Sequence, residues 1–344
     1  MDFFMAVIRH TTAVARLAFI AFLTAFLLVN GTETASAGRP KVGLVLSGGG
    51  AKGAAEVGVL KVIERAGIPI DYIAGTSIGS IVGGLYATGY DANELDSIFR
   101  KQEWLSLLTD RRDEYSSVPY KDDGERVYVF GFPVVEKSGR PLGTPGLLTG
   151  RQVEAMLDSL MGYRGYNEME NLPIPFRCVA FDMKTASEVV FSAGSPAQAM
   201  RASMSIPGCF KPVKYRDMTL VDGGMINNLP VDVVKEMGAD IVIAIDLQQK
   251  KHKPRKSSEN GILQQIAEAF PLGTMVNWAI HRPDWARYEE NRGQCDLYIN
   301  PNIPDDDTMS FKQESVERML SIGEEEGNRY WEELVALKQR LDSY

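Results

Sequence analysis

The stretch Gly75-Thr76-Ser77-Ile78-Gly79 places one serine between two glycines, where an apolar run gives way to a helical pattern of small residues. A serine at such a strand-to-helix turn can act as a nucleophile, because the sharp turn exposes its oxygen and admits only small neighbours. The G-x-S-x-G spacing is a weak signal by itself, and its position directly after a predicted strand strengthens it. Ser77 is therefore a candidate nucleophile.

No histidine of the chain is an evident acceptor for the hydroxyl proton of Ser77. Of the three histidines, His10 lies in the leader described below, His252 in a basic run, and His281 far from any glycine-rich turn. Asp222 is a better candidate, because it ends a short predicted strand and enters the turn DGG, where its carboxylate could be held rigidly. Aspartate before glycine is also common in ordinary turns, so this residue alone decides nothing.

A glycine-rich stretch, GGGAKG at Gly48–Gly53, also follows an apolar run and opens a helix. It matches the G-x-G-x-x-G pattern of dinucleotide-binding redox enzymes, but there an acidic residue ends the second strand, whereas Asp71 stands at its start. Titration of the purified protein with NAD(P)H, followed by fluorescence, would test whether it is such a redox enzyme. We favour an oxyanion hole, since successive glycines let backbone N–H groups point at one spot, and a lysine and the helix dipole add positive potential. The residues assigned to this hole are Gly48, Gly49, Gly50 and Lys52.

Short apolar runs alternate with helical patterns along most of the chain. This alternation is typical of an α/β fold, and the continuous Val/Leu-rich runs indicate buried strands of a mostly parallel sheet. The predicted strands are 41–47, 68–75, 174–183, 186–192, 240–247 and 295–301, and the predicted helices are 52–66, 79–88, 150–161, 261–270 and 309–341. Thr149 is a candidate N-cap for the helix at 150–161.

Residues 101–149 interrupt the alternation with charged, aromatic and turn-forming residues. We interpret this segment as a surface excursion, with a lid over the site as the alternative, and its RVYVFGFPVV sequence as a pair of strands. The basic run KKHKPRK at 250–256 is interpreted as a solvated linker, with contact to a membrane as the alternative.

Composition limits the class of protein. The 344 residues suffice for one large domain or two small ones, and 44% hydrophobic with 24% charged residues is ordinary for a globular protein. The net charge of −8 argues against a nucleic-acid partner.

The chain has three cysteines. Cys178, Cys209 and Cys295 cannot all pair within one chain and are interpreted as small buried side chains. No cysteine or histidine spacing in the sequence suggests a metal site.

The N-terminus has the pattern of a secretory signal peptide. Arg9 and Arg16 precede a 13-residue apolar run at 17–29, and the A-x-A sequence ASA follows at 35–37. The run is shorter than the roughly 20 residues of a spanning helix, so an uncleaved anchor is the less favoured alternative. We predict cleavage after the ASA sequence, a mature chain beginning at Gly38, and export to the periplasm, the outer membrane or the medium.

Three stretches in this order resemble the patatin-like phospholipase family: G-G-G-x-K/R-G, then G-x-S-x-G, then D-G-G/A. Here they are GGGAKG at 48–53, GTSIG at 75–79 and Asp222-Gly223-Gly224. RASMSIPGCFKPV at 201–213 is similar to the family's segment ahead of the aspartate turn. The resemblance covers about residues 41–247, and the three motifs show no departure from the family pattern.

The resemblance implies a three-layer α/β/α fold and hydrolysis of lipid acyl esters by a Ser–Asp dyad, with Ser77 as nucleophile, Asp222 as base, and no cofactor or metal. Because a carboxylate is a weak base for a serine hydroxyl, we expect burial to raise the pKa of Asp222. The implied substrate is a membrane phospholipid or another acyl lipid, and peripheral contact with a membrane stays open. A non-catalytic lipid-binding module on the same fold is the alternative, which a fluorophosphonate probe that labels no residue would support.

The resemblance also suggests how the chain is divided. We expect a signal peptide at 1–37, a catalytic domain at 38–249, and a mostly helical C-terminal extension at 250–344 that packs on the core. The likeness is to the exported bacterial branch of the family. Because the C-terminal sequence has no run of alternating strands, we do not expect the C-terminal barrel that some exported members carry.

Overall fold

The structure is a computed structural model, which describes the chain in seven stretches. These are residues 38–108, 126–129, 132–136, 148–207, 209–248, 285–303 and 311–344. The leader, the three histidines, the basic run and the helix predicted at 261–270 lie outside the described residues. Pro40–Arg340 forms one compact unit, and the architecture below is that of this unit.

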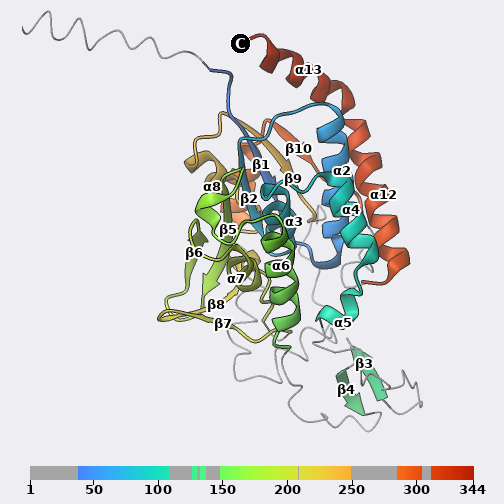
Figure 1. Cartoon of the computed structure of the whole chain (residues 1–344), viewed down its shortest axis with the longest axis vertical. Helices are drawn as coiled ribbons and strands as arrows, with labels where there is room; N and C mark the ends of the chain where they lie inside the picture. Colours follow the sequence, from blue (N-terminus) through green and yellow to red (C-terminus); the bar gives the residue numbers. More distant parts are fainter. Residues whose placement is uncertain are drawn as a thin grey trace, which may run out of the picture. The chain divides into compact units, whose positions relative to one another are not determined.

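An eight-stranded sheet crosses the unit in the order β10-β9-β1-β2-β5-β8-β7, with β6 paired to β5 off this path (Figure 1). Its strands are β1 (Val42–Leu46), β2 (Tyr72–Thr76), β5 (Phe176–Asp182), β6 (Ser187–Phe191), β7 (Val213–Tyr215), β8 (Met218–Asp222), β9 (Ile241–Ile245) and β10 (Leu297–Ile299). The neighbours from β10 to β5 are parallel, whereas β6, β7 and β8 pair antiparallel. The predicted α/β fold with a mostly parallel sheet is confirmed.

Helices connect the strands and cover both faces of the sheet. They are α2 (Gly53–Arg65), α3 (Ile78–Ala87), α4 (Ala92–Lys101), α5 (Trp104–Leu108), α6 (Arg151–Tyr163), α7 (Pro196–Ser203), α8 (Val231–Glu236), α11 (Trp285–Gly293), α12 (Gln313–Arg329) and α13 (Trp331–Asp342). Short 3-10 turns are η1 (Gly50–Lys52), η2 (Met169–Asn171) and η3 (Gly223–Met225).

Side chains of β1 point alternately to the two faces of the sheet, and their contacts show how the layers form. Val45 packs in a buried cluster with Val231 and Val234 of α8. Leu46 faces α3 on the other side, where a Cβ added at Gly83 would lie 3.1 Å from its Cδ1. With helices on both faces of the sheet, the unit is a three-layer α/β/α fold.

The α12 helix lies side by side with α2 (Figure 1). A Cβ at Gly58 of α2 would collide with the carbonyl oxygen of Leu320, and a Cβ at Gly323 of α12 would collide with that of Ala55. Glycine on both helices thus permits a close crossing. Since β10 also pairs with β9, the described residues beyond 285 contribute both a strand and a helix to this unit.

The start of the second strand differs from the prediction. β2 begins at Tyr72 rather than at residue 68. Pro69 has no N–H for a strand ladder, and Asp71 uses its carboxylate to accept the N–H of Val42 at 2.8 Å. The segment before Tyr72 therefore serves as a turn that anchors the start of β1.

Two helix predictions also differ from the structure, one by a break inside the helix and one at its N-cap. The segment predicted as one helix at 309–341 is α12 and α13, separated at Tyr330, whose φ of −99° and ψ of 15° leave the helical region. Thr149 does not cap α6, because the helix begins after Gly150 in the left-handed conformation at φ 65°. The Thr149 hydroxyl instead accepts a hydrogen bond from Arg151 Nε at 3.3 Å.

Residues 101–149 are described in part. The strand pair predicted in RVYVFGFPVV is confirmed as β3 (Arg126–Val129) and β4 (Phe132–Glu136), which pair antiparallel. The rest of this segment, apart from its two ends, lies outside the described residues, so the choice between a surface excursion and a lid stays open. Among the helices of the described stretches, none combines the length and the apolarity needed to cross a membrane.

Candidate active site

Ser77 occupies the sharp turn between β2 and α3. Its φ of 54° and ψ of −123° are strained for a residue with a Cβ. Hydrogen bonds hold both of its peptide groups: its N–H donates to Ser203 Oγ at 2.8 Å, and Ser80 Oγ donates to its carbonyl oxygen at 2.6 Å. The surrounding fold therefore maintains the strained geometry that presents the serine oxygen.

The two glycines of the serine motif permit close backbone approaches. A Cβ at Gly75 would lie 2.5 Å from the carbonyl oxygen of Gly79, and a Cβ at Gly79 would lie 2.5 Å from that of Leu46. Both distances are far inside van der Waals contact, so a larger residue at Gly75 would push β2 away from the first turn of α3, and one at Gly79 would push α3 away from β1. Packing, rather than loop freedom, explains why the neighbours of Ser77 are glycine.

The sheet register brings Asp222 to Ser77 from the opposite direction. β2 runs parallel to β5 and ends with Thr76 opposite Val179, whereas β8 runs antiparallel and ends with Asp222 opposite Ala180. The carboxyl ends of β2 and β8 therefore meet beside β5. There Ser77 Oγ donates a hydrogen bond to Asp222 Oδ2 at 2.6 Å.

Asp222 is buried and held at several atoms. Its Oδ1 accepts the N–H of Gly224 at 2.7 Å, and its own N–H donates to the carbonyl oxygen of Ser205 at 3.0 Å. Burial raises the pKa of Asp222 to about 6, against the opposite effect of the hydrogen bonds from Ser77 and Gly224. The carboxylate is thus ionised at neutral pH and more basic than an ordinary aspartate.

Close contacts also explain why glycine follows Asp222 at two positions. A Cβ at Gly223 would collide with the carbonyl oxygen of Val179, and a Cβ at Gly224 would lie 2.6 Å from Asn228 Oδ1. The turn therefore lies directly against β5, and this contact fixes the position of the carboxylate that it carries.

The glycine-rich loop after β1 lies next to Ser77. A Cβ at Gly48 would lie 3.1 Å from the Cβ of Ser77, and Gly50 lines the same pocket as Ser77. The N–H of Gly48 donates to the carbonyl oxygen of Asn228 at 3.3 Å, and Asn228 Nδ2 donates back to the Gly48 carbonyl at 3.0 Å. Within the described stretches, the N–H groups of Gly49 and Gly50 have no hydrogen-bond acceptor.

The rest of the loop packs against the nucleophile turn. Gly50 has a φ of 61°, which favours glycine. Lys52 is buried in η1, and its backbone N–H donates to the carbonyl oxygen of Gly49 at 3.3 Å. Gly53 begins α2, where a Cβ would collide with the side chain of Ile78. The structure thus brings all the residues predicted for the site into one region at the carboxyl ends of the parallel strands.

Two residues that hold the site were missed by the sequence analysis. Ser203, which accepts the N–H of the nucleophile, donates its own hydroxyl to the carbonyl oxygen of Val179 at 2.6 Å. Arg201 is 1% exposed and donates to Ser205 Oγ at 2.5 Å and to the Thr149 carbonyl at 2.7 Å. The sequence analysis singled out their segment at 201–213 only by its likeness to the family, and it gave neither residue a role.

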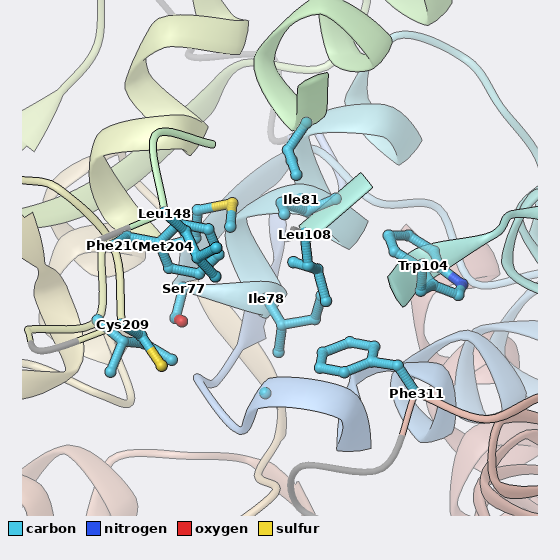
Figure 2. Close-up of a pocket in the computed structure, with 13 residues that line it drawn as sticks. Ser77, Ile78, Ile81, Trp104, Leu108, Leu148, Met204, Cys209, Phe210 and Phe311 are labelled. Carbon is cyan, nitrogen blue, oxygen red and sulfur yellow. The ribbon is translucent and has the colours of Figure 1, made fainter. Parts of the chain in front are cut away.

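An apolar pocket opens beside Ser77 (Figure 2). Its empty volume is about 620 Å³, part of which opens to solvent. Trp104, Leu108 and Leu148 belong to its walls. Both ends of the segment at 101–149 therefore line the pocket, which its interpretation as a surface excursion did not anticipate, although a lid over the site was the alternative.

The three cysteines are free thiols. Cys178 is fully buried in β5 as predicted, whereas Cys209 and Cys295 are only partly buried. Burial raises the pKa of the Cys178 and Cys209 thiols, and Cys209 lines the pocket. Across the described stretches, no three side chains of metal-binding type cluster together.

Comparisons with known proteins agree with the motif order. Residues 44–235, more than half of the chain, match the family model described as patatin-like phospholipase. Lysophospholipase NTE1 of Scheffersomyces stipitis is 32% identical over 206 residues, which cover 60% of this chain and 12% of that relative. Human patatin-like phospholipase domain-containing protein 6 is 33% identical over 208 residues, which cover 60% of this chain and 13% of that relative.

The chain spans about an eighth of the length of these two relatives. Among solved structures, VipD from Legionella pneumophila is similar with a TM-score of 0.41 and 15% identity, covering 89% of this chain and 67% of that chain. The family match itself extends from β1 to α8 and includes the serine and aspartate turns. The chain therefore belongs to the patatin-like phospholipase family.

Proposed function

We propose that this protein is a serine lipid acyl hydrolase of the phospholipase A, lysophospholipase or esterase type. The observation that carries the proposal is the 2.6 Å hydrogen bond from Ser77 Oγ to Asp222 Oδ2 beside an apolar pocket. A nucleophile in contact with a base, next to a site for an apolar group, suits hydrolysis of a fatty acyl ester. This chemistry requires neither a cofactor nor a metal.

In the first half-reaction, Ser77 Oγ attacks the carbonyl carbon of the ester while Asp222 Oδ2 accepts the hydroxyl proton. The tetrahedral intermediate then collapses, the bond from carbon to the alcohol oxygen breaks, and Asp222 gives the proton to the leaving alcohol. The acyl group remains on Ser77 as a new ester. The raised pKa of Asp222, about 6, supports this role because the carboxylate is more basic yet still ionised at neutral pH.

In the second half-reaction, water attacks the acyl group on Ser77. Asp222 takes a proton from the water and returns it to Ser77 Oγ as the carbon–oxygen bond to the serine breaks. The products are a free fatty acid and the regenerated hydroxyl. The same pair of residues therefore serves both steps.

The negative charge on the carbonyl oxygen needs donors at the glycine-rich loop. We assign this role to the N–H groups of Gly49 and Gly50, since the N–H of Gly48 already donates to Asn228. Gly50 lines the pocket together with Ser77, which supports the assignment. One donor of this kind contributes roughly 10²- to 10³-fold to the rate.

The place of action follows from the N-terminal pattern rather than from the described residues. Arg9, Arg16 and the apolar run at 17–29 support export, and we propose that the mature enzyme meets membrane lipid outside the cytoplasm. Contact with the membrane surface would then be peripheral.

The test is incubation of the purified mature protein with a mixed phospholipid extract, followed by mass spectrometry of the products. We expect free fatty acid together with the matching deacylated lipid, and neither product from the Ser77→Ala protein. Labelling of Ser77 by a fluorophosphonate probe should accompany the activity. Absence of both products and labelling would contradict the proposal and favour a lipid-binding module without catalysis.

A further inference from the structure

The pocket beside Ser77 offers almost no polar partner to a ligand. Among the side chains that line it, Ser77 contributes a hydroxyl, and Met204 and Cys209 contribute sulfur. The indole N–H of Trp104 already donates to the carbonyl oxygen of Phe99 at 2.8 Å. A phosphate or glycerol group would lose its hydration in this pocket without gaining hydrogen bonds. The hydrocarbon part of an ester is therefore the part that fits.

We propose that the pocket receives one fatty acyl chain, and that Trp104 and Phe311 close its far end and so set the longest chain that the enzyme accepts. The proposal rests on the proposed function, because it concerns the acyl side of the same ester. The alcohol side of the substrate, with any charged head group, would then stay outside the apolar walls.

The path of the chain follows from the residues after the nucleophile. Ile78 comes directly after Ser77, and Ile81 lies one turn further along the same face of α3. Both side chains line the pocket. In Figure 2, Ile78 and Leu108 lie between Ser77 on one side and the aromatic rings of Trp104 and Phe311 on the other. An acyl chain attached to Ser77 Oγ thus extends along α3 towards these rings.

The far wall is held firmly in place. Trp104 is 4% exposed, and its ring centroid lies 4.9 Å from that of Phe99, to which its N–H is also bound. The Phe311 ring lies 6.2 Å from the Trp104 ring, at an interplanar angle of 38°. An indole held by a tilted ring contact and a hydrogen bond to Phe99 cannot swing aside for a longer chain without losing both contacts.

The opposite wall is also fixed by backbone bonds. The N–H of Leu148 donates to the carbonyl oxygen of Cys209 at 3.0 Å, and the N–H of Lys211 donates to that of Leu148 at 2.8 Å. The guanidinium of Arg201 lies 5.0 Å from the centroid of the Phe210 ring, behind this wall. With both walls held, the pocket has a definite length, which favours selection by chain length over adaptation to any chain.

The test measures kcat/KM for p-nitrophenyl esters from butyryl to palmitoyl. For the wild type we expect kcat/KM to rise roughly 3- to 4-fold with each methylene that the pocket buries, and to fall once the chain reaches Trp104. Phe311→Ala should move the maximum to longer chains, and Trp104→Leu should do the same. Leu108→Trp should move it to shorter chains, because the added ring fills the path.

Trp331→Ala is the matched control. This tryptophan lies on α13, is 36% exposed, and has the Arg65 guanidinium 5.0 Å from its ring centroid rather than a place in the pocket. For the Trp331→Ala protein, the dependence of kcat/KM on acyl chain length should coincide with that of the wild type. Since Phe311 is only half-buried, its variant keeps the test valid if Trp104→Leu fails to fold.

A binding measurement separates this proposal from the proposed function. In the Ser77→Ala background, fatty acids of the same lengths should displace a fluorescent fatty acid, and Phe311→Ala should shift the best competitor to longer chains. If the wild type hydrolyses esters but Phe311→Ala and Leu108→Trp keep its profile, the proposal is overturned while the hydrolase function stands. If the wild type hydrolyses no ester, the proposed hydrolase function is wrong. If Phe311→Ala also leaves the fatty-acid competition profile unchanged, the proposal about chain length is overturned as well.

Discussion

The Ser77 hydroxyl lies 2.6 Å from the Asp222 carboxylate although 145 residues separate the two in the chain. Their contact depends on β5, which pairs parallel with β2 and antiparallel with β8, so that the ends of both strands meet at Val179 and Ala180. A shift of β8 by one residue would turn Asp222 to the other face of the sheet. The catalytic pair proposed here is therefore a consequence of strand register.

The first prediction concerns the pH dependence of hydrolysis. Because burial raises the pKa of Asp222 to about 6 and only the ionised carboxylate accepts a proton, activity should decline on the acid side. We expect kcat/KM to fall about tenfold for each pH unit below 6. A pH–rate profile on a neutral ester, over a range in which circular dichroism shows a folded protein, measures this. A rate that stays constant down to pH 4.5 would contradict it.

The second prediction concerns stability. The pKa of Asp222 is higher in the folded protein than its ordinary value of 3.8, so the folded state binds more protons between about pH 4 and pH 6. The free energy of unfolding therefore decreases as the pH rises through this window and stays lower above it. Asp222→Asn removes this cost, and should raise the free energy of unfolding by about 1–3 kcal/mol at pH 8.

Urea unfolding at pH 8 and at pH 4.5 checks the stability prediction. The gain from Asp222→Asn should be clear at pH 8 and much smaller at pH 4.5, where the carboxyl is protonated in the folded wild type. An equal effect at both pH values would mean that the ionised form of Asp222 does not destabilise the fold.

The third prediction concerns the glycine-rich loop. A Cβ at Gly49 would lie 2.7 Å from Leu247, so Gly49→Val should displace the loop and its N–H donors while leaving Ser77 in place. We expect ester hydrolysis to fall by at least roughly 10²-fold. Gly293→Val is the control, since a Cβ at Gly293 meets nothing within 4 Å. Near-normal turnover by a folded Gly49→Val protein would show that this loop does not stabilise the transition state.

The fourth prediction concerns processing of the N-terminus. N-terminal sequencing of protein recovered from outside the cytoplasm should find Gly38 as the first residue. Ala37→Arg should block cleavage, because the A-x-A pattern requires a small residue there, whereas Ser36→Arg at the unrestricted middle position should not. Recovery of the protein with residues 1–37 still attached would instead indicate a membrane anchor.

Much of the sheet could be predicted, because its parallel strands are buried on both faces. VGLVL in β1 and IVIAI in β9 are continuous apolar runs with every residue buried, and such runs are distinct in any sequence. Ends of elements were less predictable. Gly150 rather than Thr149 is the N-cap of α6 because a left-handed residue turns the chain there, and no composition signal separates that glycine from others.

The candidate site was predictable where local geometry restricts the residue type. The motif is visible in the sequence because Gly75, Ser77 and Gly79 all lie within one turn, where Gly75 contacts the carbonyl group of Gly79 and Gly79 contacts that of Leu46 in β1. The support from Ser203 depends on tertiary packing of α7 against β5, which leaves no local pattern. The same holds for the pocket, where Phe311 and Trp104 meet from distant parts of the chain.

The measurement that tests the central claim most directly compares Asp222→Asn with His252→Ala and His281→Ala in one ester-hydrolysis assay, with circular dichroism showing that each protein is folded. The Ser–Asp account predicts that Asp222→Asn loses roughly 10²- to 10⁴-fold or more, that adding Ser77→Ala costs little further, and that both histidine variants retain wild-type turnover. If a histidine variant is inactive while Asp222→Asn turns over normally, the base is a histidine and the Ser–Asp account is wrong.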